Sequence, residues 1–167
     1  MGVDPSCRST GYAIVEQLAG NRLAAVEFGV IPIKRNVPLP EALYAIHSKI
    51  ISKIEEFAPD LLVIEAVFYA QNVKSAIALG AVRGVVLLAA QQTETPVAEY
   101  SATQIKVAVA GYGRADKEAV QKMVQVALNL KEIPSPNDAS DALAAAICHL
   151  NSARLKERID ASIGSNR

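Results

Sequence analysis

Four acidic side chains in this sequence lie where an α/β fold would bring them together. Asp4 ends the first predicted strand, and Glu65 ends a short, wholly apolar run. Asp138 and Asp141 are three residues apart at the start of a predicted helix, so they share one helix face. In open α/β sheets, ligands bind at the carboxyl ends of the strands. If the two strands are neighbours, their carboxylates converge, and the helix can carry its own pair to the same point.

The residue types at these positions favour bound divalent cations. Four carboxylates in one cleft repel each other and do not all stay ionised unaided. Oxygen ligands without His or Cys favour magnesium or manganese over zinc. Two such ions about 4 Å apart form a clamp for in-line attack on a phosphodiester. The sequence therefore predicts a two-metal phosphodiesterase that uses two magnesium or manganese ions.

Most of these acidic residues also have a structural explanation. Asp4 precedes Pro5 and can simply start a turn. The helix dipole favours acidic residues in a first turn, which would account for Asp138 and Asp141. Glu65 is harder to explain in this way, because a charge at the end of a buried run needs a partner. The four residues together carry the prediction better than any one of them.

The hydrophobic pattern predicts the elements that would position these residues. Short strands at the start of the chain, at residues 10–15 and at 22–33 have short connections, which indicates an antiparallel meander. The pattern then alternates between helices and buried strands. Helices are expected at about 40–57, 72–92, 103–110, 117–130 and from 138 to about 151 or beyond, and strands at 61–64 and 96–100. This order predicts an α/β fold with a mixed sheet of about five strands, the meander followed by parallel strands, flanked by helices.

Composition and charge limit the class of protein. A length of 167 residues suggests one domain, which we place at residues 1–151, with a polar C-terminal tail at 152–167 that we expect to fray. A hydrophobic share of 51% excludes a disordered chain, and two cysteines are too few for a disulfide scaffold. Uncharged runs fall short of the ~20 residues of a membrane span, so we expect a cytoplasmic protein without membrane contact.

The charge balance excludes an indiscriminate polycation that coats nucleic acid. The chain has 17 Lys and Arg residues against 17 Asp and Glu residues. If four carboxylates are bound to cations, 17 positive charges stand against 13 negative ones. A nucleic-acid enzyme with locally segregated charge is therefore compatible with the composition.

Four ordered motifs resemble the RuvC family of Holliday-junction resolvases. They are Gly2-Val3-Asp4-Pro5 with Thr10-Gly11-Tyr12, Ile64-Glu65-Ala66-Val67-Phe68, Gly111-Tyr112-Gly113-Arg114-Ala115-Asp116-Lys117, and Asp138-Ala139-Ser140-Asp141-Ala142-Leu143-Ala144. The resemblance covers residues 2 to about 150 and implies a ribonuclease-H-like fold and a homodimer. It implies magnesium-dependent, paired nicking of a four-way DNA junction, in homologous recombination and DNA repair. It also implies the branch-migration proteins RuvA and RuvB as partners.

The resemblance assigns roles to single residues. The family's four metal-binding carboxylates correspond to Asp4, Glu65, Asp138 and Asp141. Lys106 and Lys117 correspond to lysines near the scissile phosphate, where a cation stabilises developing charge. Phe68 corresponds to an aromatic residue that contacts junction bases, and stacking on a base is worth roughly 1–3 kcal/mol.

Several of these residues also have an explanation that involves no function. Lys117 could be a solvated lysine after a helix cap at Asp116, and Phe68 could be a core residue. Four basic residues are candidate phosphate contacts in DNA binding or, alternatively, ordinary surface charges: Lys74, Arg83, Arg114 and Lys122.

Three departures from the family pattern accompany the resemblance. Ser6 stands where the family has glycine, and Gln71 where it has a basic residue. Only three residues precede Asp4, whereas the family has a longer first strand, so a natural start further upstream is one expectation.

Other functions stay open at this point. The opening Gly2-Val3-Asp4 with Thr10-Gly11 also resembles the phosphate loop of sugar kinases and actin-like ATPases, although that fold needs a longer, two-lobed chain. A non-catalytic nucleic-acid-binding relative gains nothing from clustered negative charge beside DNA. A ribonuclease-H-like nuclease could act on RNA–DNA hybrids.

A dimer would distinguish the resolvase, because a two-fold protein can cut a two-fold junction symmetrically. We expect its surface on the helix predicted at 72–92, where Ala76, Gly80, Ala81 and Gly84 permit close approach of a second helix.

Overall fold

Five strands form one mixed sheet in the order β3-β2-β1-β4-β5. The computed structural model describes residues 1–6, 8–33, 36–66 and 73–164, without the side chains of Lys74 and residues 157–164. The strands are β1 (Gly2–Asp4), β2 (Ser9–Gln17), β3 (Leu23–Pro32), β4 (Leu62–Ala66) and β5 (Val97–Ser101). The α-helices are α1 (Leu39–Phe57), α2 (Val73–Gln92), α3 (Ala102–Ala110), α4 (Lys117–Ala127) and α5 (Asn137–Gly164), and a short 3₁₀ turn, η1, spans Ala19–Asn21.

The pairing confirms the predicted mixed sheet. β1 pairs antiparallel with β2, and β2 pairs antiparallel with β3, which is the expected meander. On its other side, β1 pairs parallel with β4, and β4 pairs parallel with β5. The strands that carry Asp4 and Glu65 near their carboxyl ends are therefore neighbours, with these ends at the same edge of the sheet.

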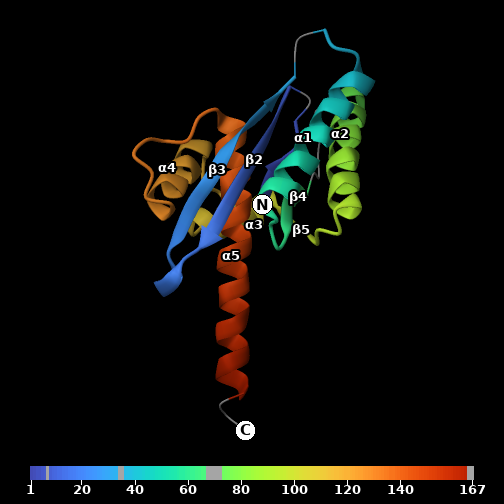
Figure 1. Cartoon of the computed structure of the whole chain (residues 1–167). Helices are drawn as coiled ribbons and strands as arrows, with labels where there is room; N and C mark the ends of the chain where they lie inside the picture. The colour runs from blue at the N-terminus through green and yellow to red at the C-terminus, as the bar shows by residue number, and fades with distance from the viewer. Residues whose placement is uncertain (7, 34–35, 67–72, 165–167) are drawn as a thin grey trace.

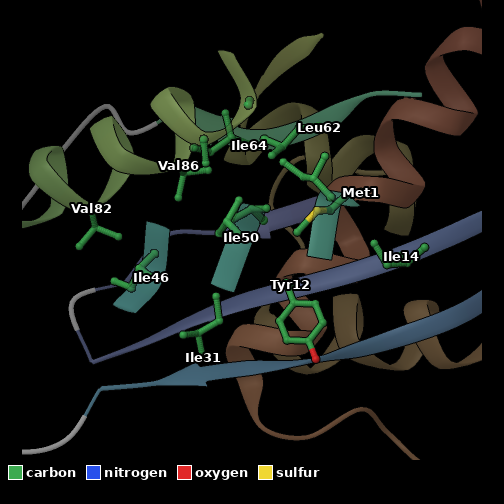
Figure 2. Close-up of a cluster of buried hydrophobic side chains, with 14 residues drawn as sticks. Met1, Tyr12, Ile14, Ile31, Ile46, Ile50, Leu62, Ile64, Val82 and Val86 are labelled. Atoms are coloured by element: carbon green, nitrogen blue, oxygen red, sulfur yellow. The ribbon is translucent and has the colours of Figure 1, made fainter. Parts of the chain in front are cut away.

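Alternating side chains along the strands divide the core into two layers. Leu62 and Ile64 face α1 and α2, whereas Val63 between them faces α3, α4 and α5. Figure 1 shows α1 and α2 side by side on one side of the sheet and α4 on the other. Figure 2 shows the first layer, in which Ile46 and Ile50 of α1 and Val82 and Val86 of α2 pack with strand side chains.

Helix α5 lies directly against the central strands because small residues permit it. Ala142, Ala144 and Ala145 are almost fully buried, and alanine has the strongest helix propensity. On the sheet side, a Cβ atom at Gly2 would overlap the carbonyl oxygen of Ala142, and one at Gly11 would overlap that of Asp138. The two glycines thus set how closely the start of α5 approaches β1 and β2.

Helix α5 continues to Gly164, and its later turns project beyond the sheet (Figure 1). Residues 152–164, which we expected to form a frayed tail, are thus helical in the structure. The domain boundary at residue 151 stays a prediction.

Within the described residues, one helical stretch, Ser75–Gln92 of α2, is long and apolar enough to span a membrane. Only 22% of this stretch is buried in the protein. However, Val82 and Val86 of the same helix are core residues, so one side of α2 is committed to the sheet. A single helix of this kind does not indicate a membrane protein.

Candidate active site

Three of the four predicted carboxylates form a cluster. Asp4 ends β1, while Asp138 and Asp141 lie in the first turns of α5. Single carboxylate oxygens of the three residues lie within 4.8 Å of one another, and all three side chains are half-buried. Asp4 lies opposite Gly11 in the β1–β2 register, and Gly11 is where the backbone of Asp138 approaches the sheet. The close approach of α5 at Gly11 therefore brings two distant parts of the chain together.

Glu65 lies on the neighbouring strand at the corresponding height. Val3 of β1 pairs with Ile64 of β4, so Asp4 and Glu65 follow as the next residues of two parallel strands. Val3 and Ile64 face α1 and α2, and alternation therefore turns both acidic side chains toward α5. Glu65 is outside the group of three with oxygens within 4.8 Å, but its charge still acts on Asp4.

Burial and mutual repulsion make this cluster costly to ionise. Burial, followed by the charges of Asp141, Asp138 and Glu65, raises the pKa of Asp4 from 3.8 to about 8. Burial and the charge of Asp141 likewise raise the pKa of Glu65. Burial and repulsion therefore oppose ionisation of Asp4 and Glu65, and added positive charge would favour it.

A hard divalent cation fits this set of donors. The clustered side chains offer carboxylate oxygens and no His or Cys atom, which is the ligand type of magnesium and manganese. A cation at this position would restore the ionised state of Asp4 against the repulsion of its neighbours. The residues present therefore fit the metal that the sequence predicted.

The predicted lysines supply positive charge at the cluster. Lys117 Nζ donates a hydrogen bond to Oδ2 of Asp141 at 2.8 Å. Burial lowers the pKa of Lys117, but this bond and the charges of Asp141, Asp4 and Asp138 outweigh burial, and the net pKa is raised. Lys106 of α3 acts electrostatically on Glu65 and favours its ionised form. Asp116 caps α4 by accepting a hydrogen bond from the backbone N–H of Ala119 at 2.7 Å. The helix cap at Asp116 is therefore compatible with a position of Lys117 at the acidic cluster.

A hydroxyl group orients one of the carboxylates. Ser9 Oγ, at the start of β2, donates a hydrogen bond to Oδ2 of Asp138. Ser9 was not predicted from the sequence, where its signal is weak: it lies two residues before Gly11, the point at which α5 approaches the sheet. The loop after Asp4 is closed by Thr10, whose fully buried hydroxyl donates to the Ser6 carbonyl at 3.2 Å.

The predicted DNA contacts differ in what the structure shows. Phe68 lies outside the described residues, as does the side chain of Lys74 on α2. Arg114, between α3 and α4, and Lys122 on α4 are exposed, and their phosphate contacts stay predictions. Arg83 of α2 instead bonds within the protein: its guanidinium donates to the Glu65 carbonyl at 3.2 Å and pairs with the Glu99 carboxylate at 2.6 Å.

Comparison with known proteins identifies the family. The model of the family described as "Crossover junction endodeoxyribonuclease RuvC" matches residues 1–149. The chain belongs to the RuvC family. It is 44% identical to RuvC of Halothermothrix orenii over 158 residues, covering 95% of each chain. It is 48% identical to RuvC of Pelotomaculum thermopropionicum over 149 residues, covering 89% of this chain and 90% of that one.

Solved structures agree with this family assignment. The structure of T. thermophilus RuvC in complex with Holliday junction substrate superposes with a TM-score of 0.88 at 32% identity, covering 93% of this chain and 94% of that chain. The yeast mitochondrial Holliday junction resolvase Ydc2 matches with a TM-score of 0.67 at 14% identity, which shows the shared fold alone. The fold is ribonuclease-H-like, as the resemblance predicted. The RuvC family consists of metal-dependent nucleases. Membership of this family argues against the alternative of a sugar-kinase-like or actin-like ATPase.

Proposed function

We propose that this protein is a Holliday-junction resolvase that nicks two opposed strands of a four-way DNA junction in homologous recombination and DNA repair. The observation that carries the proposal is the cluster of Asp4, Asp138 and Asp141 beside Glu65, in a RuvC chain. A structure of T. thermophilus RuvC with Holliday junction substrate supports the choice of DNA substrate. The four carboxylates would hold two Mg²⁺ ions, and Mn²⁺ has the same ligand preference.

The side chains of the site divide the work of phosphodiester hydrolysis. When bound, the metal ions supply an activated water and charge stabilisation at the phosphate. Asp4 and Glu65 hold fixed positions because they lie near the ends of two paired strands, and Ser9 orients Asp138. The Lys117 side chain is 51% exposed at the cluster, so its ammonium group can donate to a phosphate oxygen as negative charge develops. Lys106 adds positive charge on the Glu65 side.

Helix α2 supplies the surface that we propose for the homodimer. Val73, Ile77 and Leu88 are large apolar residues with 76%, 66% and 50% exposure. Gly80 and Gly84 lie between them at helical spacing, and a Cβ at either glycine would meet no atom within 4 Å. An apolar stripe with small central residues fits a second copy of the same helix across a two-fold axis. Such a dimer would present two acidic clusters to the two strands of a junction.

The remaining parts of the proposal rest on the family. We propose that the protein works in the cytoplasm with the branch-migration proteins RuvA and RuvB. Mixing it with RuvA–RuvB-bound junctions and measuring the rate of cutting would test this partnership.

A comparison of substrates tests the proposed function. Labelled four-way junction, linear duplex and RNA–DNA hybrid of matched sequence are incubated with the protein and magnesium. We expect paired nicks that are confined to the junction. Cutting of the hybrid alone would keep the metal site and contradict the junction substrate.

A further inference from the structure

Arg83 joins three elements at the edge of the acidic cluster. It lies on α2, and its side chain is only 20% exposed. Its Nη1 donates to the backbone carbonyl of Glu65 on β4 at 3.2 Å, and its Nη2 lies 2.6 Å from Oε2 of Glu99 on β5. Glu99 pairs with Ile64 in the β4–β5 register, directly before Glu65. The guanidinium of one α2 residue therefore bridges the parallel strands β4 and β5.

The bond reaches Glu65 through its backbone and not through its carboxylate. The α2 side of the sheet carries Ile64, whereas the Glu65 side chain turns to the α5 side. The charges that act on the Glu65 carboxyl group come from Asp141, Lys106 and Lys117. Arg83 thus fixes where the backbone of Glu65 lies, while other residues set the charge of its side chain.

Glu99 explains why an arginine serves here. A guanidinium offers several N–H donors in a fixed plane, so one side chain can bond a carbonyl and a carboxylate together. The Glu99 side chain is 47% exposed, so it neutralises the guanidinium at the protein surface. A lysine would keep the charge but could not reproduce this two-point geometry.

We propose that Arg83 is a positioning residue for the metal site, which holds the end of β4 so that Glu65 faces Asp4, Asp138 and Asp141. This inference rests on the proposed function of the same carboxylates. In this proposal Arg83 positions Glu65 and does not contact a phosphate of the DNA. It also links the active site to α2, the helix that carries the proposed dimer surface.

Metal affinity and junction affinity separate the two roles. Supporting residues behind metal ligands typically contribute 10- to 100-fold in metal affinity or activity. We therefore expect Arg83→Gln to weaken Mn²⁺ binding by about 10-fold or more. A phosphate contact would instead lower junction affinity and flatten its dependence on salt.

The test measures both properties in the same variants. Bound Mn²⁺ is followed by electron paramagnetic resonance without DNA, and junction binding is measured without metal at two salt concentrations. The variants are Arg83→Gln, Arg83→Lys, Glu99→Gln and, for contrast, Arg114→Gln, an exposed predicted phosphate contact. Circular dichroism and ultracentrifugation establish that fold and assembly match those of the wild type.

The proposal predicts weaker Mn²⁺ binding for Arg83→Gln, a partial loss for Arg83→Lys and Glu99→Gln, and unchanged junction affinity for all three. Arg114→Gln should show the reverse pattern. Unchanged Mn²⁺ affinity in Arg83→Gln would overturn the proposal, and so would a loss of junction affinity with a flatter salt dependence. If Arg83→Gln does not fold, Glu99→Gln decides by the same criteria. A wild type that binds Mn²⁺ but cuts no junction would contradict the proposed function, while the Mn²⁺ comparison would still decide the role of Arg83.

Discussion

The ammonium nitrogen of Lys117 lies 2.8 Å from Oδ2 of Asp141, so α4 presents a cation to the acidic cluster of β1 and α5. Lys117 is the first residue of α4, and its position is fixed by the Asp116 cap. Its charge favours ionisation of Asp4 and Glu65, against the repulsion among the carboxylates. The lysine thus stabilises the ionised cluster from the edge at which a phosphate would enter.

Replacing Lys117 with glutamine should slow cleavage strongly while the protein still folds. Removal of one donor aimed at developing charge typically costs about a hundredfold or more in rate. The measurement is the single-turnover rate of junction cleavage at saturating protein and magnesium. Lys131→Gln, at an exposed lysine, is the matched control and should cleave at the wild-type rate. Equal cleavage rates for Lys117→Gln and Lys131→Gln would show that Lys117 does not contribute to cleavage.

Stability without metal should depend on pH through Asp4. Its pKa is about 8 in the folded protein and 3.8 in the reference state, so the folded state holds a proton that the unfolded state loses first. The contribution of Asp4 to the free energy of unfolding is therefore largest below about pH 4, and it falls as the pH rises to about 8. Asp4→Asn should lose less stability over this range. Thermal melting in a chelator measures the effect, and parallel pH profiles for wild type and Asp4→Asn would contradict it.

Magnesium should reverse this pH effect. A cation that binds the folded site stabilises the protein by mass action, and binding requires deprotonated carboxylates. The magnesium-induced rise in melting temperature should therefore grow from pH 6 to pH 8 in the wild type. It should be small in Asp4→Asn at both values. An equal rise in both proteins would place the bound magnesium elsewhere.

Gly11→Ala should disturb the fold and the metal site together. A methyl group at Gly11 would overlap the carbonyl oxygen of Asp138, so the start of α5 must move away from β2. Overpacking of this kind costs typically 1–3 kcal/mol. Urea unfolding measures the stability, and Mn²⁺ binding measures the site. Gly29→Ala is the control, since its Cβ would meet the Tyr12 side chain at 3.3 Å, and it should leave Mn²⁺ binding unchanged.

Gly80→Leu should produce monomers that are otherwise folded. A Cβ atom at Gly80 meets no atom within 4 Å in the monomer, and leucine has a higher helix propensity than glycine. In the proposed dimer it would stand between the two copies of α2. Analytical ultracentrifugation measures the mass, and junction binding should weaken with loss of the dimer. Val126→Leu, at an exposed position of α4, should stay dimeric. An unchanged dimer in Gly80→Leu would contradict the placement on α2.

The sequence predicted the elements, and it placed acidic residues where the structure brings Asp4, Asp138 and Asp141 together, because both have local signals. The apolar run before Glu65 and the spacing of Asp138 and Asp141 are visible without the structure. Asp4 and Glu65 could converge only if their strands were neighbours, and the parallel β1–β4 pairing makes them so. The roles of single residues in metal and DNA binding stay predictions.

The contacts that surround the carboxylates could not be predicted, because they join residues far apart in the chain. Ser9 reaches Asp138 only after α5 packs on β2. Arg83 looked like a surface charge suited to phosphate, and its bonds to Glu65 and Glu99 depend on how α2 lies over β4 and β5. The last helix was expected to end at about residue 151 or beyond, and its end at Gly164 could not be read from the sequence because the residues after Ser152 are mostly polar.

Cleavage of a labelled four-way junction by the wild type and by Asp141→Asn tests the central claim most directly. The two proteins are compared across a magnesium titration, with junction binding measured in parallel. Loss of a metal ligand removes several kcal/mol of charge stabilisation, and 1.36 kcal/mol is tenfold in rate. The account predicts paired, magnesium-dependent nicks for the wild type and at least about a hundredfold slower cleavage by Asp141→Asn, with junction binding retained. Wild-type rates in Asp141→Asn, or cleavage without any divalent metal, would contradict it.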